Sequence, residues 1–148
     1  MASRSFHEVF RTATEHHPYT YQERLATCES IPELLNVPTA GGKTAAAVLA
    51  WVWRRRFAGP EVATGTPRRL VYCLPMRVLV EQTRRCIDEW VHRLAQAYPD
   101  LAENPIGVHT LMGGDANDDW LLKPDSDCIT IGTQDMLLSR ALNRGYAM

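Results

Sequence analysis

The sequence predicts an α/β fold in which a mostly parallel sheet has helices on both of its faces. Short apolar runs alternate along the chain with longer segments whose apolar residues recur at helical spacing. The first apolar run is followed by a glycine-containing loop and then by a helical segment, which is the order that builds parallel strands. With 148 residues, of which 45% are apolar, the chain has room for about one domain. We expect a ligand at the carboxyl ends of the strands.

Each element follows from periodicity and from the residues that bound it. Apolar runs predict four strands, at residues 34–37, 70–74, 106–111 and 128–131. Helical spacing predicts five helices, at residues 6–13, 20–26, 44–56, 78–98 and 134–142. A Thr-x-x-Glu capping box, Thr20 to Glu23, begins the second of them. The strand at 70–74 is apolar on both alternating faces, which indicates a central strand covered on both sides.

Composition excludes several classes of protein. The chain has 16 basic and 17 acidic residues and a formal net charge of -1, so it is no polycation that binds by bulk charge. Its cysteines form no C-x-x-C pair, which argues against a zinc site and favours reduced, mostly buried thiols; they are Cys28, Cys73, Cys86 and Cys128. The sequence shows neither a secretory signal nor a membrane span, and we expect a cytoplasmic protein with no membrane partner.

The loop before the third helix has the composition of a phosphate-binding loop. Small residues let backbone N–H groups converge on an anion at a helix N-terminus. In such a loop Lys43 would reach the β and γ phosphates of ATP, and the hydroxyl of Thr44 would hold Mg²⁺. The strict G-x-x-x-x-G-K-[ST] pattern is not met, because Val37 stands where the first glycine belongs. The candidate nucleotide-binding residues are Thr39, Ala40, Gly41, Gly42, Lys43 and Thr44.

This loop resembles motif I of the superfamily 2 helicases, Ala/Gly-x-Thr-Gly-x-Gly-Lys-Thr. Residues 38–44, Pro-Thr-Ala-Gly-Gly-Lys-Thr, fit that form with one departure. Ala40 stands where the family usually has glycine, and Gly41 comes next. The resemblance therefore implies a tight turn that is shifted by one residue.

A segment upstream of the loop looks like a Q-motif-type adenine site. The amide of Gln22 has the donor and the acceptor that the adenine edge requires, and Tyr19 or Tyr21 would lie against the base. The other interpretation is that Gln22 is simply the second residue of a capped helix and that both tyrosines are packing residues.

Three later segments resemble nucleic-acid contacts of the same family. The turn that contains Pro75 and Arg77 looks like motif Ia, in which a cation at a helix N-terminus meets a strand phosphate. Arg77 is otherwise a solvated surface charge. Gly113 and Gly114 resemble the family's glycine pair. The fourth strand leads into Thr133 and Gln134, which would contact a further phosphate.

The closest resemblance is to the CRISPR-associated helicase-nuclease of type I systems. It covers nearly the whole chain and includes residues 19–26, 36–39, 74–83 and 131–140. It implies N-terminal helices with the Q-motif-like segment over residues 1–30, and an incomplete first RecA-like domain over residues 31–148. It also implies a motor that an RNA-guided CRISPR complex recruits and that moves along single-stranded DNA using ATP and Mg²⁺.

The sequence lacks the groups that hydrolyse ATP in such motors. No strand carries an Asp-Glu pair, and Asp118 and Asp119 fall in a loop ahead of the fourth strand. His16 and His17 precede Pro18 and are interpreted as loop residues, not as a nuclease metal site. We therefore expect a truncated first motor domain that binds ATP without hydrolysing it alone. A small P-loop phosphotransferase and a catalytically inactive nucleotide- or DNA-binding module are the alternatives.

Overall fold

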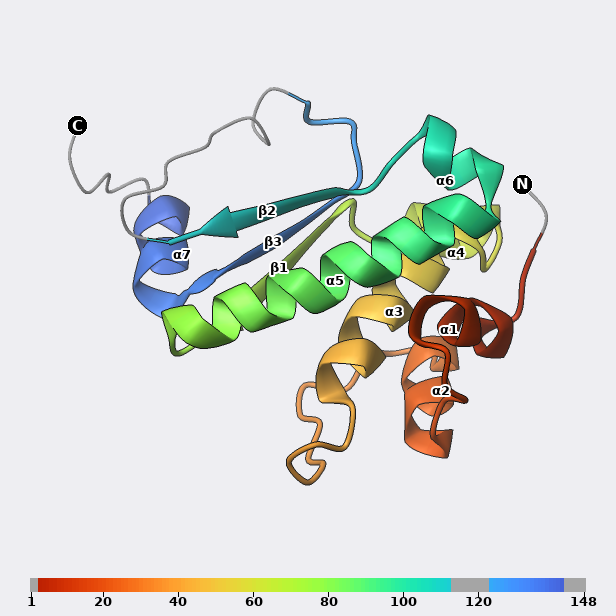
Figure 1. Cartoon of the computed structure of the whole chain (residues 1–148), viewed down its shortest axis with the longest axis horizontal. Helices are drawn as coiled ribbons and strands as arrows, with labels where there is room; N and C mark the ends of the chain where they lie inside the picture. The colour runs from red at the N-terminus through yellow and green to blue at the C-terminus, as the bar shows by residue number, and fades with distance from the viewer. Residues whose placement is uncertain (1–2, 113–122, 143–148) are drawn as a thin grey trace.

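Within the residues that the structure describes there is one three-stranded sheet, and all of its strands are parallel (Figure 1). The structure is a computed structural model, and it describes residues 3–112 and 123–142. The strands are β1 (Arg69–Leu74), β2 (Gly107–Leu111) and β3 (Cys128–Thr133), in the order β1-β3-β2. The central strand β3 is buried at every residue. A mixed α/β fold with a parallel sheet is confirmed.

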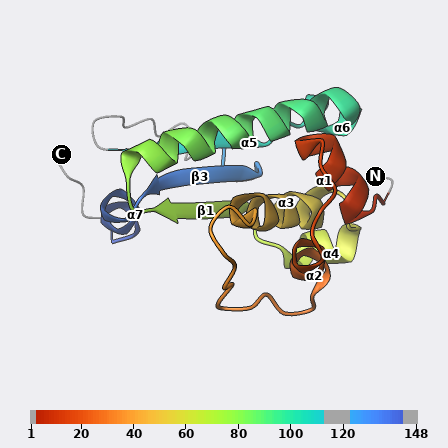
Figure 2. The same cartoon turned by 60° about the horizontal axis from the view of Figure 1, so that its bottom comes forward.

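Seven helices surround this sheet within the described residues. They are α1 (Phe6–Thr14), α2 (Thr20–Thr27), α3 (Lys43–Arg56), α4 (Pro60–Gly65), α5 (Arg77–Ala97), α6 (Pro99–Glu103) and α7 (Gln134–Ala141). The long helix α5 lies over the sheet, whereas α2 and α3 lie on the β1 side of it (Figure 2). No helix of the described residues is long and apolar enough to span a membrane.

One hydrophobic cluster joins the N-terminal helices to the sheet. Its fully buried members include Val9 of α1, Ala26 of α2, Val52 of α3, Ile87 of α5 and Ile131 of β3. The buried residues of α1 lie three or four positions apart and those of α5 lie seven apart, so each set forms a stripe on one face of its helix. Helix α3 has six buried residues, as its nearly continuous apolar composition predicts.

Helix α3 runs antiparallel to the strands, and this direction places both of its ends. Near its beginning, the Oγ1 atom of Thr44 lies 3.0 Å from the hydroxyl oxygen of Tyr72 in the second half of β1. Near its end, Arg55 and Arg56 pair with Asp127, which immediately precedes β3. The start of α3 therefore faces the carboxyl half of the sheet and its end faces the amino edge.

The expected strand at residues 34–37 does not form. These residues lie in a segment without helix or strand between α2 and α3, and Leu34 is 80% exposed. The apolar run is only four residues long and is bounded by Pro32 and Pro38, which restrict the backbone on both sides. Among the described residues, β1 is consequently an edge strand.

Burial on β1 also differs from the prediction of a strand covered on both sides. Leu70, Tyr72 and Leu74 pack against the core, whereas Val71 is 58% exposed and Cys73 is exposed. At this strand only one face is covered.

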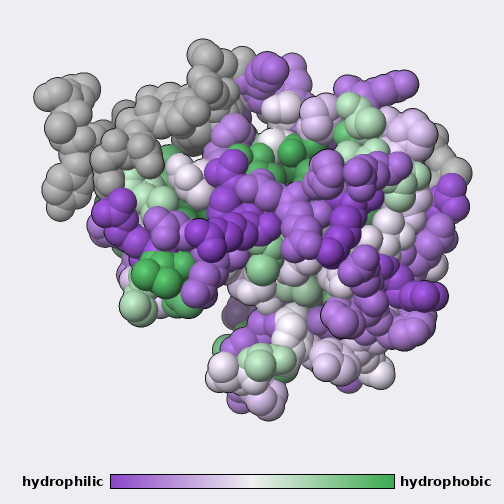
Figure 3. All heavy atoms as spheres, viewed as in Figure 1, coloured by the Kyte–Doolittle hydropathy of each residue, from purple (hydrophilic) through white to green (hydrophobic). Residues whose placement is uncertain are grey.

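Apolar side chains are also exposed where α5 begins. Met76, Val78 and Leu79 are exposed there, and Figure 3 shows a hydrophobic area at this end of α5. The apolar spacing along α5 predicts that Leu79 is buried, whereas this side chain is exposed in the first turn of the helix.

Three local expectations are wrong for identifiable reasons. No element is predicted between residues 56 and 70, yet Pro60 begins the short helix α4 there, in the N1 position that suits proline. The cap of α2 lies one residue earlier than the Thr20–Glu23 capping box, since the carboxamide of Gln22 binds the backbone of the N-cap residue Tyr19. The thiols are not mostly buried, because Cys73 and Cys86 are exposed and only Cys128 is fully buried.

Candidate nucleotide-binding site

The loop before α3 contains two residues in the left-handed backbone region. The N–H group of Gly41 donates to the carbonyl oxygen of Pro38 at 3.0 Å, which closes a turn. The third residue of that turn, Ala40, has φ 65°, as a type II turn requires, and Gly42 has φ 78°. The turn has therefore not shifted to Gly41: Ala40 adopts the strained conformation itself, at the position where the resembled motif has glycine.

The glycines of the loop are required by close packing within the chain. A Cβ atom on Gly41 would lie 2.4 Å from a methyl carbon of Val37 and 2.9 Å from the carbonyl oxygen of Pro38. A Cβ atom on Gly42 would lie 2.6 Å from Nε2 of Gln22. The loop is consequently folded tightly onto itself and onto α2.

Helix α2 holds the loop through two carbonyl oxygens. The hydroxyl of Tyr21 donates to the carbonyl oxygen of Gly41, and Nε2 of Gln22 donates to that of Gly42 at 3.0 Å. In a trans peptide the carbonyl and the following N–H point in opposite directions. The N–H groups of Gly42 and Lys43 therefore point away from α2.

The amino end of α3 is open to an anion. Among the described residues, no side chain caps it, and the N–H groups of a first helical turn have no partner within the helix. Lys43 is the first residue of α3, and its side chain is exposed. Free N–H groups, the positive end of a 14-residue helix and an exposed ammonium group together suit a phosphate.

The hydroxyl of Thr44 already has one partner in the chain, Tyr72. A hydroxyl group has one donor and two lone pairs, so a contact with Tyr72 leaves lone pairs for a cation. The described residues contain no cluster of three His, Cys, Asp or Glu side chains that would hold a metal by themselves. The residues present thus fit Mg²⁺ only as a companion of a bound phosphate, and the role of Thr44 in holding it stays a prediction.

Gln22 has a structural role whether or not it reads adenine. Its side chain is 2% exposed, its Oε1 atom accepts from the N–H group of Tyr19 at 2.7 Å, and its Nε2 atom binds Gly42. Gln22 lies in the first turn of α2 as its third residue, one position later than predicted, and its own side chain binds the N-cap residue. Contact with adenine stays a prediction.

The two tyrosines beside the loop form a parallel pair. The rings of Tyr19 and Tyr21 are 6.3 Å apart between centroids and 15° apart in plane. Tyr19 is 61% exposed, so one aromatic face near the loop is available to a planar ligand. The pKa of Tyr21 is raised, chiefly by burial, which keeps its hydroxyl protonated as a donor.

Two of the candidate nucleic-acid contacts meet at the carboxyl edge of the sheet. Leu74 pairs with Thr133 in the parallel register, so the segments after β1 and after β3 begin side by side. Pro75 and the exposed Arg77 follow the first strand, and Gln134 begins the helix that follows the second. Gly113 and Gly114, with Asp118 and Asp119, lie outside the described residues.

A carboxylate already lies at the N-terminus of α7. Thr133 is 8% exposed, and its side chain hydrogen-bonds Asp135. This bond, together with weaker contacts to the backbone N–H groups of Met136 and Asp135, lowers the pKa of Asp135. A strand phosphate at Thr133 would have to displace this carboxylate, and the predicted contact is untested.

Sequence reasoning missed what the three arginines at the end of α3 do. Arg54 donates to the carbonyl oxygens of Ala26 and Cys28 at 2.7 and 2.9 Å, which fixes the end of α2. Arg55 and Arg56 bind Asp127, with charged atoms 2.8 and 2.6 Å apart. No local pattern links Asp127 to residues more than 70 positions away, so only the fold shows that these arginines bind groups within the chain.

Comparisons of this chain with protein-family models, with curated proteins and with solved structures found no match.

Proposed function

We propose that this chain binds ATP, with Mg²⁺, at the loop from Thr39 to Thr44. The observation that carries the proposal is the open amino end of α3, toward which Gly42 and Lys43 direct their N–H groups while α2 holds the loop carbonyls on the opposite side. In this arrangement Lys43 would bind the terminal phosphates, and the hydroxyl of Thr44 would hold the metal ion that accompanies them.

The larger role that we propose is that of the front part of an ATP-driven nucleic-acid motor of superfamily 2. The motif-like segments support it by their order along the chain. The segments after β1 and β3 also lie side by side at one edge of the sheet, where both can contact the backbone of one nucleic-acid strand. On this proposal the fold is the partial RecA-like domain of a CRISPR-associated helicase, which acts in the cytoplasm on single-stranded DNA exposed by an RNA-guided complex.

The residues of the loop account for ATP binding but not for accelerated hydrolysis. Lys43 and Thr44 bind phosphate and metal in the ground state and the transition state alike, so they give affinity without a large acceleration. Loss of an arginine finger alone lowers turnover by roughly 10³ to 10⁵. We therefore expect ATP binding by this chain without steady turnover, even with single-stranded DNA.

Calorimetry with ATP and Mg²⁺ tests the proposal. Lys43→Ala should abolish the heat of binding, whereas Arg85→Ala, which removes an exposed cation from α5, should leave it unchanged. Both variants should have the melting temperature of the wild type, because both side chains are exposed. Equal affinity in the wild type and in Lys43→Ala would refute the proposed site. A DNA-dependent phosphate release that Lys43→Ala abolishes would favour a complete small P-loop enzyme instead.

A further inference from the structure

A second cavity lies at the other end of α3, where the amino ends of the strands meet. Its volume is about 990 Å³. Its walls come from the last turn of α3, from Arg68 before β1, from the segment before β2 and from residues 123–127 before β3. It shares no residue with the loop at Thr39 to Thr44, and α3 separates the two.

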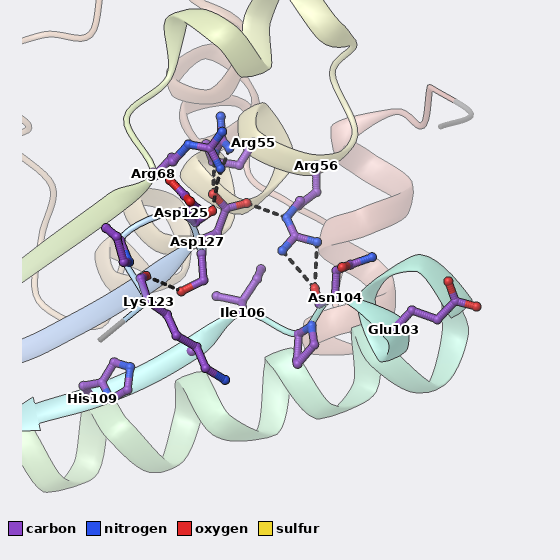
Figure 4. A pocket seen from close by; sticks show the side chains of 14 residues that line it. Arg55, Arg56, Arg68, Glu103, Asn104, Ile106, His109, Lys123, Asp125 and Asp127 are labelled. Carbon is purple, nitrogen blue, oxygen red and sulfur yellow. Dashed lines mark hydrogen bonds and ion pairs between the residues drawn. The ribbon is translucent and has the colours of Figure 1, made fainter. Parts of the chain in front are cut away.

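The floor of this cavity carries more positive than negative charge. Asp127 is 6% exposed and lies between Arg55 and Arg56, whose side chains are 11% and 10% exposed (Figure 4). Two guanidinium groups and one carboxylate leave one unit of positive charge where water is largely excluded. The negative carboxyl end of α3 offsets about half of a unit charge, so the floor remains positive.

Several donors of the cavity have no acceptor among the described residues. Of the five N–H donors of Arg56, three have acceptors among the described residues, one on Asp127 and two on the carbonyl oxygen of Asn104. Arg68 uses one donor, on the carbonyl oxygen of Asp125. The ammonium group of Lys123 forms no ion pair within the described residues, and this side chain lines the same cavity, with its end pointing away from Arg55 and Arg56 (Figure 4).

Apart from the buried Asp127, the acidic side chains of the cavity lie exposed at its rim and favour a small ligand. Glu103 and Asp125 are both exposed, and Figure 4 shows that Glu103 points away from the arginines. Carboxylates at the rim repel a polyanion that lies across the surface, whereas a single anionic group can enter past them. Guanidinium groups match the oxygens of phosphate in pairs.

From this charge distribution we infer that the cavity is a binding site for the phosphate group of a small molecule. Arg56 and Arg68 donate to its oxygens, Lys123 adds a mobile positive charge, and Ile106 and Pro105 contact the body of the ligand. The site is independent of the proposed ATP-binding loop, and each can fail without the other.

Nuclear magnetic resonance with inorganic phosphate as the probe tests this inference. Phosphate should shift the amide signals of Gly107 and Ser126 in a saturable way. Removing one charge-assisted donor costs about a tenfold loss of affinity, and we expect that loss in Arg68→Ala and in Lys123→Ala. Arg85→Ala, on the exposed face of α5, should bind as the wild type does.

Several outcomes would overturn the inference. They are amide shifts that do not saturate, an affinity that is equal in all four proteins, or shifts confined to the amides of Gly42 and Lys43. A single-stranded oligonucleotide that shifts the same cavity amides more strongly than phosphate does would replace the small ligand with nucleic acid. Because Arg68 and Lys123 are exposed, thermal melting of both variants should match the wild type, which separates lost binding from lost folding.

Discussion

The two ends of α3 differ in how their polar groups are paired. At its amino end an uncapped turn, free N–H groups and the exposed Lys43 are left open, and the contacts that hold the loop are neutral hydrogen bonds from Tyr21 and Gln22. At its carboxyl end, two arginines are tied to the buried carboxylate of Asp127. The closed end anchors the helix to the sheet, so that the open end can present its donors without contributing much to stability.

The largest expected effect is at the closed end. Asp127→Ala removes the carboxylate between two largely buried guanidinium groups and should lower the free energy of unfolding by about 3–5 kcal/mol. The matched control is Asp88→Ala, which breaks an exposed pair with Arg84 on α5 and should cost at most about 1 kcal/mol. Urea denaturation measures both. Similar losses in the two variants would contradict the contrast between the ends.

A smaller loss of stability is expected where α2 meets the open end. Gln22→Ala leaves the N–H group of Tyr19 and the carbonyl of Gly42 without their side-chain partner and should cost about 1–3 kcal/mol. Gln82→Ala, on the exposed face of α5, should change stability by no more than about 0.5 kcal/mol. Because Gln22 also orients the loop, its variant should bind ATP more weakly than Gln82→Ala does. Unchanged stability and affinity would show that Gln22 does not hold the loop.

Tyr21→Phe should remove a single hydrogen bond while preserving the aromatic ring. We expect a loss of about 1 kcal/mol in unfolding free energy, together with weaker ATP binding, since the Gly41 carbonyl is no longer held. Tyr19→Phe keeps the same ring pair and loses no contact with the loop, so it is the control. Thermal melting and calorimetry on the two variants would distinguish them, and equal behaviour would contradict the role of the Tyr21 hydroxyl.

The same hydroxyl predicts a pH dependence. Burial raises the pKa of Tyr21, a hydrogen bond with Gln22 lowers it, and the charge of Tyr19 raises it, with a net increase above 10.0. An acid whose pKa is raised by folding stabilises the protein below its unfolded pKa and loses that contribution as pH rises through the folded value. Wild-type stability should therefore fall above about pH 10 more steeply than that of Tyr21→Phe. Identical alkaline profiles would contradict this assignment.

The smallest effect is expected at Ala40, and its sign is opposite. An alanine with positive φ carries a strain of roughly 1–2 kcal/mol, which glycine would relieve. Glycine also increases the conformational entropy of the unfolded chain, and this offsets part of the gain in stability. Ala40→Gly should therefore raise stability by up to about 1 kcal/mol. The same substitution within α3, Ala47→Gly, should lower it by about 1 kcal/mol. If both substitutions destabilise, Ala40 is not strained in solution.

The sequence determined the elements whose signals are local. Helical spacing placed α1, α3 and α5, and apolar runs placed β1, β2 and β3 to within two residues at most ends. It also placed a loop before α3 and predicted the start of this helix within one residue of Lys43, because small residues before a helix follow from backbone geometry alone.

Only the tertiary structure decided which of these elements join the sheet and which polar groups meet. The run at 34–37 is as apolar as a strand but found no pairing partner, since strand formation depends on neighbours that are distant in sequence. The cluster of Arg55, Arg56 and Asp127 and the contacts of Gln22 and Tyr21 with the loop bridge 20 to 72 positions. Such contacts leave no periodic trace in the sequence, because they arise from how α3 lies between α2 and the sheet.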